Sequence, residues 1–353
     1  DNGHITLTTQ QFKNAFNSEV TFFQHGINSD SGAFKWMTEE IGKRQNVIDL
    51  GVISNRYTKG SIVLNDSAKR KLEKLNIFED AQMQYEQVVD RLLSMGYNVL
   101  FRTEFANPTG GHYEQIGELS EFINSVTHES DKINLVGHSK GGLVSVGYSA
   151  YNPNRVSKVV TIDTPYLPNA FAKASVELMD NAHYVYEKAK ENLEHSNFLQ
   201  YPGDYLQFKL AEQSFKLAVM VGTTGSQKDY NKIQGLRDLA GETNALKLIR
   251  NQWNLQQKKG QLNSVNAYAF ATDSFDEVSV SLGLGLNYST GNGDLVVSIE
   301  SQRAPGFNGI DPFTFTTYGD DRNDFLSMDY SHMGITERPF TREIVEVYLG
   351  LQH

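Results

Sequence analysis

The sequence contains no cysteine among its 353 residues. Disulfide bonds, a thiolate nucleophile and zinc ligation by cysteine are therefore excluded together. No apolar run approaches the ~20 residues that a helix needs to cross a bilayer, which argues against a membrane-spanning segment. The chain starts at Asp1 without methionine. Together with the missing cysteines, this start leads us to expect a secreted or cell-surface protein.

Positive charge is also scarce. Lysine and arginine together number 32 against 42 acidic residues, which gives a net charge of −10, and the basic residues are scattered. Nucleic-acid binding is thereby disfavoured, because phosphates require clustered basic side chains. Hydrophobic residues make up 39% of the chain and aromatic residues 11%, which suffices for a packed core. The length suits one large α/β domain or two smaller domains.

Short apolar segments alternate with segments of helical spacing through the first half of the chain. Several of the apolar segments would be buried on both faces, as in the strands of a covered parallel sheet. The expected strands are residues 19–26, 46–54, 97–105, 132–138, 157–165 and 265–273, and the expected helices are residues 34–45, 79–95, 113–126 and 139–151. This order predicts an α/β fold with a mostly parallel central sheet flanked by helices.

The alternation stops after Pro165. Residues 166–262 show helical spacing but no convincing strand, and one continuous helix is expected at about Leu236–Asn251. A closing helix is expected at residues 340–350. We therefore expect an α/β core formed by residues 1–165 and 263–353, with residues 166–262 as a helical insertion.

The segment "INLVGHSKGGLVSVGYSA", residues 133–150, places Gly-His-Ser-Lys-Gly between an expected strand and an expected helix. A serine in G-x-S-x-G at such a junction sits on a sharp turn with its hydroxyl exposed. The glycines at 137 and 141 leave room for that turn, and the start of the helix favours developing negative charge. The alternative is a glycine-rich turn with an incidental serine. The flanking strand and helix favour a nucleophile, Ser139.

Four motifs resemble those of the α/β-hydrolase superfamily, and more narrowly of its bacterial lipase-like and esterase-like members. They are "FFQHGINS", "LVGHSKGG", "VVTIDTPY" and "GNGDLVVSIESQ" with "YSHMGIT" downstream. The resemblance covers the two parts of the core but not the insertion. In this superfamily the serine, the acid and the histidine follow one another along the chain, and Ser139, Asp294 and His332 have that order.

The resemblance implies a role for each motif. His332 would be the general base, and Asp294 would orient it. Asp273, at the end of an expected strand, is the alternative acid. The backbone N–H groups of Ile27 and Lys140 would form the oxyanion hole, and no metal or other cofactor is expected.

Other acidic and histidine residues receive structural interpretations. Asp163 is interpreted as a structural residue flanking the site, and His25 as a residue that shapes its loop. The side chain of His138 is expected to point away from Ser139. The acidic run that follows residue 317 contains Asp320, Asp321, Asp324 and Asp329. Its spacing matches no calcium loop, so we interpret it as a solvated loop.

The resemblance also implies that the insertion forms a cap or lid over the acyl-binding site. Tyr166, Leu167 and Phe171 are candidates to contact substrate there. Further apolar residues that could line such a wall are Leu178, Met179, Phe198, Phe215 and Trp253. The alternative for each of them is that it packs the cap against the core.

Taken with the motifs, the resemblance predicts a serine hydrolase that cleaves carboxylic esters, lipid-like ones in particular, through an acyl-enzyme. The expected partners are a small ester substrate and a transient lipid or membrane interface, with no nucleic acid. Two alternatives stay open. The same triad could serve an amidase, peptidase or acyltransferase, and a hydrolase scaffold could carry a non-catalytic surface interaction protein.

Overall fold

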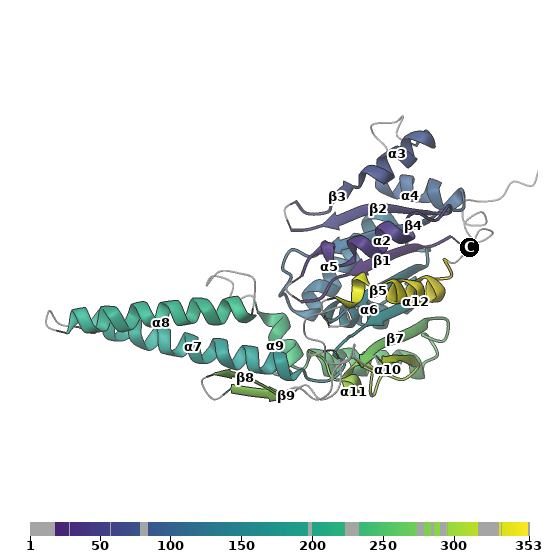
Figure 1. Ribbon diagram of the computed structural model, residues 1–353. Coiled ribbons are helices and arrows are strands. Elements are labelled where there is room, and N and C mark those ends of the chain that lie inside the picture. Colours follow the sequence, from purple (N-terminus) through teal and green to yellow (C-terminus); the bar gives the residue numbers. More distant parts are fainter. Residues whose placement is uncertain are drawn as a thin grey trace, which may run out of the picture.

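The computed structural model describes residues 18–27, 29–56, 58–77, 84–196, 200–222, 233–273, 279–283, 286–289, 294, 296–316, 332 and 334–351. Within these residues the chain forms one large central sheet with helices packed on it and a long helical hairpin that leaves its side (Figure 1).

The central sheet has eight strands in the order β10-β7-β6-β5-β1-β4-β2-β3. Every neighbouring pair is parallel except β2 and β3, which are antiparallel at one edge. The strands are β1 (Val20–Gln24), β2 (Val47–Ser54), β3 (Ser61–Leu64), β4 (Asn98–Glu104), β5 (Ile133–His138), β6 (Val156–Ile162), β7 (Asn266–Asp273) and β10 (Ile310–Thr316), and β8 (Ser279–Gly283) pairs with β9 (Leu286–Ser289) separately. The predicted α/β fold with a mostly parallel sheet is confirmed.

Helices cover both faces of this sheet. The helices of the described residues are α2 (Lys35–Ile41), α3 (Asp66–Lys74), α4 (Tyr85–Ser94), α5 (His112–Val126), α6 (Lys140–Tyr151), α7 (Ala170–His195), α8 (Tyr201–Gly222), α9 (Gln234–Ala240), α10 (Ala245–Lys258), α11 (Ile299–Gln302) and α12 (Pro339–Leu349), with short 3₁₀ turns at Ser31–Phe34, Pro153–Arg155 and Ile335–Glu337. No helix among the described residues has the apolar length that a bilayer crossing requires.

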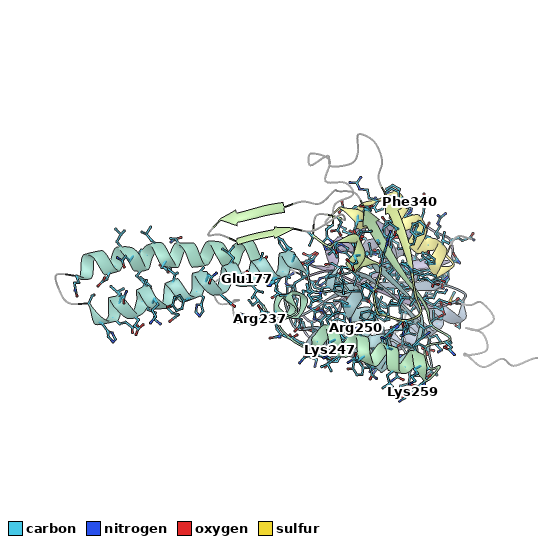
Figure 2. The ribbon with its side chains drawn as sticks, turned by 90° about the horizontal axis from the view of Figure 1, so that it is seen from below. Glu177, Arg237, Lys247, Arg250, Lys259 and Phe340 are labelled. Carbon is cyan, nitrogen blue, oxygen red and sulfur yellow. The ribbon has the colours of Figure 1, made fainter. Side chains whose placement is uncertain are left out.

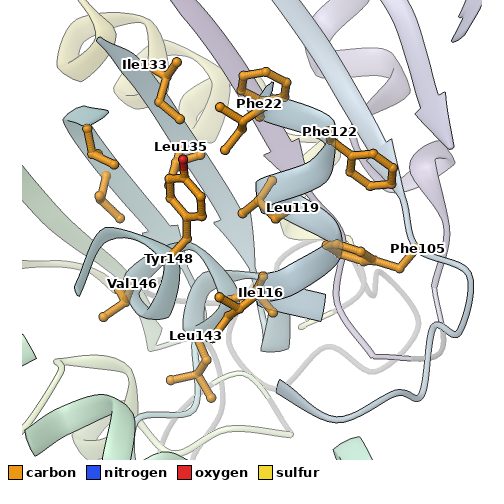
Figure 3. Packing of buried hydrophobic residues seen from close by; sticks show 14 of the residues in the cluster. Phe22, Phe105, Ile116, Leu119, Phe122, Ile133, Leu135, Leu143, Val146 and Tyr148 are labelled. Carbon is orange, nitrogen blue, oxygen red and sulfur yellow. The ribbon is translucent and has the colours of Figure 1, made fainter. Parts of the chain in front are cut away.

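The burial of neighbouring strand residues shows why both faces need cover. In β1, Phe22 packs into a cluster with α4, α5, α6 and α10, whereas Phe23 packs into a second cluster with α2 and α12. Leu135 and Val136 of β5 divide between the same two clusters. Figure 3 shows the first cluster, where Ile116 and Leu119 of α5 lie against the sheet. A strand that is apolar on both faces is fully buried only when helices cover both faces of the sheet.

The segment after β6 is built mainly from helices α7 to α10. The 26-residue helix α7 and the 22-residue helix α8 pack as an antiparallel pair that projects from the body of the molecule (Figures 1 and 2). At its base, Arg237 of α9 contacts Asp180 of α7, with Nη2 and Oδ1 2.6 Å apart. Helix α9 therefore links the hairpin to the core.

Several elements differ from the sequence-based expectation. The single helix expected at Leu236–Asn251 is wrong: α9 ends at Ala240, Gly241 adopts a left-handed φ of 79°, and α10 begins at Ala245. Glycine tolerates that conformation and commonly terminates helices. The strands β3 and β10, the two edges of the sheet, were not anticipated.

Candidate active site

Ser139 lies at the junction between β5 and α6 in a conformation that few side-chain-bearing residues adopt. Its φ is 55° and its ψ is −128°, and its backbone N–H donates to Ile162 O of the neighbouring strand at 2.9 Å. Such backbone strain persists only where the surroundings enforce it, and it is concentrated at functional sites. The side chain thus stands at the carboxyl end of the sheet and at the N-terminus of α6.

Glycines make room for this turn. A Cβ atom at Gly141 would collide with the backbone carbonyls of Gln24 and His25, and one at Gly137 would collide with the backbone of Gly141. A Cβ at Gly26 would lie 2.9 Å from Cβ of Ser139. Strand β1, the loop that follows it and the elbow are therefore in direct contact, which brings the backbone around Ile27 beside the serine.

A buried carboxylate and a histidine form the second part of the site. Oδ2 of Asp294 lies 2.7 Å from Nδ1 of His332, and the backbone N–H of His332 donates to Asp294 O at 3.1 Å. The other oxygen, Oδ1, accepts from the backbone N–H groups of Val296 and Val297 at 2.9 and 2.7 Å. Asp294 is fully buried and His332 is 5% exposed. The loop after Asp294 therefore fixes its carboxylate with two N–H donors before the histidine adds a third.

The two candidate acids lie in different places relative to His332. Asp294 is the carboxylate on Nδ1 of His332, whereas Asp273 is the last residue of β7 and is partly exposed. With Nδ1 engaged by Asp294, Nε2 is the ring nitrogen left for a proton transfer.

Two further histidines adjoin this pair. The His138 ring packs against that of His332 with centroids 4.7 Å apart, a contact that the sequence did not reveal. Burial, and next the proximity of His332, hold the pKa of His138 well below its ordinary value. Burial also lowers the pKa of His25 to about 4, and its Nδ1 lies 2.8 Å from Gly26 O. His25 thus shapes its loop as a neutral ring.

Lys140, whose backbone N–H opens α6, has a fully buried side chain. Its Nζ donates to Gly110 O and to Oε1 of Gln115, the latter at 2.6 Å. Burial lowers the pKa of this amine to about 7. The side chain therefore points into the packing between α5 and α6, and only the backbone of this residue is available to a reacting group.

Ser139 and His332 line one cavity of about 270 Å³. Residues of the segment after β6 form part of its wall, namely Asn169, Phe171, Ala172, Leu236 and Leu239. The rest of the lining comes from the core: Gly26, Ile27, Ser29, Ala33, His138, Pro165, Val296, Val297 and Thr336. Among the described residues, this lining includes no Asp, Glu, Lys or Arg.

The candidate cap residues differ in position. Phe171 lines the cavity. Tyr166 is fully buried with its hydroxyl 2.9 Å from Oγ1 of Thr161, and the backbone N–H of Leu167 donates to Oγ of Ser301 at 2.9 Å. Tyr166 and Leu167 are not among the residues that line this cavity, and their role in the cap stays a prediction. Trp253, Met179 and Leu178 are likewise buried in the core.

Asn169 lines the cavity, and the sequence did not single it out. Asn169 caps α7 by accepting from Ala172 N at 2.8 Å, and its Nδ2 donates to Val296 O at 2.8 Å. Its backbone N–H donates to Leu239 O at 2.7 Å. Asn169 thus joins α7, α9 and the Asp294 loop at the cavity. Its only sequence signal was an asparagine ahead of a helical segment. The side chains of Phe198 and Phe215, and the acidic run Asp320, Asp321, Asp324 and Asp329, lie outside the described residues.

No curated protein matches the sequence significantly. Solved structures with similar folds include a Listeria innocua gene product (12% identity, 94% of each chain, TM-score 0.47). They also include a lipase-esterase related protein from Clostridium acetobutylicum (16% identity, 94% of this chain and 96% of that chain, TM-score 0.40) and naproxen esterase from Bacillus subtilis (11% identity, 94% and 84%, TM-score 0.38).

The family model described as the alpha/beta hydrolase fold matches residues 118–276. This range runs from within α5 through the elbow and the helical segment to the end of β7. The match and the order of strands agree on the alpha/beta hydrolase fold for this part of the chain.

Proposed function

We propose that this protein is a serine hydrolase that cleaves carboxylic esters through an acyl-enzyme. One observation carries the proposal: the cavity that contains Ser139 on its strained turn is also lined by His332, whose Nδ1 is held by buried Asp294. A hydroxyl nucleophile, a base and an orienting carboxylate in this order are what acyl transfer requires.

In the acylation step, Oγ of Ser139 attacks the ester carbonyl carbon while Nε2 of His332 takes the hydroxyl proton. The carbonyl π-electrons move to the oxygen, and the N–H groups of Ile27 and Lys140 stabilise the oxyanion. Collapse of this intermediate expels the alcohol, which receives the proton from His332. One such donor is typically worth ~10²–10³ in rate, so the two together are a large part of the expected catalysis.

In the deacylation step, water attacks the acyl-enzyme and His332 takes one of its protons. Collapse of the second tetrahedral intermediate releases the carboxylic acid, and His332 returns the proton to Oγ of Ser139. Asp294 stays ionised throughout and stabilises the imidazolium that forms twice per turnover. The backbone N–H donors on its Oδ1 support that charged state.

The wall of the cavity indicates the substrate class. Phe171, Leu236, Leu239 and Val297 contribute apolar side chains, and the lining described above is uncharged. A charged acyl chain would lose its hydration there without gaining a partner, whereas an alkyl or aryl chain would gain from burial. We therefore propose esters with an apolar acyl group, lipid-like esters included, with the helical segment 166–262 serving as the cap that shapes their site.

The decisive experiment is labelling by a fluorophosphonate probe, which reacts with activated serines. Ser139→Ala, which removes only the hydroxyl, is the matched control. Labelling of the wild type at Ser139 and not of the variant is the expected result. If the wild type stays unlabelled, the protein is a non-catalytic member of the superfamily and the proposal fails.

A substrate panel separates the reactions that share this mechanism. Nitrophenyl esters of increasing acyl length are compared with aminoacyl anilides, and an added alcohol tests acyl transfer. The proposal requires ester hydrolysis to dominate. Faster anilide cleavage would make the protein an amidase, and preferential transfer to alcohol would make it an acyltransferase.

A further inference from the structure

A third acidic side chain, Asp163, reaches the Asp294–His332 pair from a separate strand. It follows directly on β6, with a left-handed φ of 48°, and its backbone N–H donates to Phe270 O of β7 at 2.9 Å. The side chain is fully buried. One of its carboxyl oxygens and ring nitrogens of His138 and His332 all lie within 4.8 Å of one another. Oδ2 of Asp294 lies 2.7 Å from Nδ1 of the same His332, so the two carboxyl groups are neighbours in the site.

The two carboxyl groups receive unequal numbers of donors. Asp294 accepts from two backbone N–H groups on Oδ1 and from His332 on Oδ2. Asp163 accepts the backbone N–H of Thr272 on Oδ1 at 3.1 Å, an N–H that also donates to Oε1 of Gln302 at 2.6 Å. The Thr272 side chain lies close enough to lower the pKa of Asp163, but among the described residues the buried Oδ2 has no hydrogen-bond partner. Donors to the charged form stabilise it, so the negative charge is favoured on Asp294.

Two adjacent buried carboxylates cannot both be ionised without a counter-charge. The neighbouring His138 does not supply one, since burial holds its pKa well below the ordinary value and keeps the ring neutral. Burial first, and next the charge of Asp294, raise the pKa of Asp163 well above its usual range. A proton on Oδ2 removes the repulsion and turns the unsatisfied oxygen into a donor.

We propose that Asp163 is a neutral carboxylic acid in the folded protein and that its Oδ2–H donates a hydrogen bond to the Asp294 carboxylate. The chain Asp163–Asp294–His332 then carries a single negative charge. Asp163 is a positioning residue: it holds the Asp294 carboxylate against His332 through a donor and does not touch substrate. Its catalytic consequence rests on the proposed function, but its protonation state does not.

Infrared difference spectroscopy tests the protonation directly. The spectrum of Asp163→Asn is subtracted from that of the wild type at pH 7, in the resting protein without substrate. Loss of the carbonyl stretch of a neutral carboxylic acid is expected. Loss of carboxylate bands would show that Asp163 is ionised and would overturn the proposal. The same subtraction in the Ser139→Ala background gives the answer even if the protein has no esterase activity.

A pair of variants tests the positioning role. Asparagine reproduces the proposed arrangement, because its oxygen can accept from Thr272 N–H while its NH₂ donates to Asp294. Alanine removes the donor. We expect kcat/KM of Asp163→Asn to exceed that of Asp163→Ala by about tenfold or more, the value of a hydrogen bond to a charged group. Equal losses in the two variants would contradict the positioning role, and circular dichroism confirms that both are folded. If the alanine variant does not fold, the infrared measurement alone decides.

Discussion

The carboxylate of Asp294 and the imidazole of His332 are 38 positions apart in the chain and 2.7 Å apart in space. A backbone hydrogen bond from His332 N–H to Asp294 O reinforces the side-chain contact, and one from Asp294 N–H to Val297 O closes the loop that carries the acid. The loop that carries the acid is therefore fastened to the loop that carries the base. A pair held in this way keeps one tautomer of the imidazole, with the proton on Nδ1.

This contact predicts the effect of removing the charge. Asp294→Asn should lower kcat for ester hydrolysis by about 10⁴, the loss known for the equivalent change in a serine-protease triad. An amide can donate to Nδ1 but cannot stabilise the imidazolium. Asp273→Asn is the matched control, because Asp273 is a nearby acid at the end of β7 and should cost far less. A large loss at 273 with a minor one at 294 would reverse the assignment.

The elements that could be predicted are those whose signal is local. Alternating apolar and amphipathic segments predicted six parallel strands of the core, and G-x-S-x-G between a strand and a helix predicted the elbow at Ser139. The order of serine, acid and histidine came from motif resemblance, and the structure places Asp294 on His332.

The missed elements lack such a signal. Strand β10 contains Pro312 and lies at an edge of the sheet, where proline is tolerated. In the sequence alone, this proline indicates that no strand is present. The break after α9 depends on one glycine in an otherwise helical pattern. The approach of Asp163 to His332 joins the end of β6 to a distant loop, an arrangement that only the assembled sheet creates.

The strained backbone of Ser139 predicts that a substitution which relieves the strain stabilises the protein, although it removes the nucleophile. Its φ of 55° and ψ of −128° suit glycine and penalise any residue with a Cβ. Ser139→Gly and Ser139→Ala should both abolish hydrolysis, but only the glycine variant relieves the strain. We expect Ser139→Gly to be about 1 kcal/mol more stable than Ser139→Ala, as relief of 1–3 kcal/mol is partly offset by the entropy of glycine. Urea unfolding of the two variants checks the difference, and an alanine variant of equal or greater stability would show that the turn is unstrained.

The cavity wall predicts which residue sets acyl-chain preference. Phe171 of α7 lines the cavity with Ser139, so Phe171→Ala should enlarge the site. The ratio of kcat/KM for nitrophenyl decanoate to that for nitrophenyl butyrate should rise roughly tenfold, in line with the value of buried apolar contact. Tyr184→Ala is the control, since Tyr184 also lies on α7 but is 64% exposed. An unchanged ratio in Phe171→Ala would exclude this helix from the acyl site.

The buried amine of Lys140 predicts a rise of stability with pH. Burial lowers its pKa from the ordinary 10.5 to about 7, so between about pH 7 and 10 the unfolded chain holds a proton here that the folded chain lacks. The free energy of unfolding therefore rises with pH in this window, and the cost of burying the charge is fully present only below it. Lys140→Met abolishes this dependence. Its neighbours Gly110 O and Gln115 lose a donor in the variant, but that loss adds a constant offset that does not alter the pH slope.

The measurement is urea unfolding of the wild type and of Lys140→Met at pH 7 and pH 9. The stability of the wild type relative to the variant should increase by about 2 kcal/mol between these pH values. Lys69→Met removes an exposed lysine on α3 and controls for the change in net charge. A relative stability that stays flat with pH would mean that the amine is charged in the folded protein as well. Lys140 would then require an anionic partner in the packing between α5, α6 and α9, and the largest attraction on it comes from Asp238, which acts against the effect of burial.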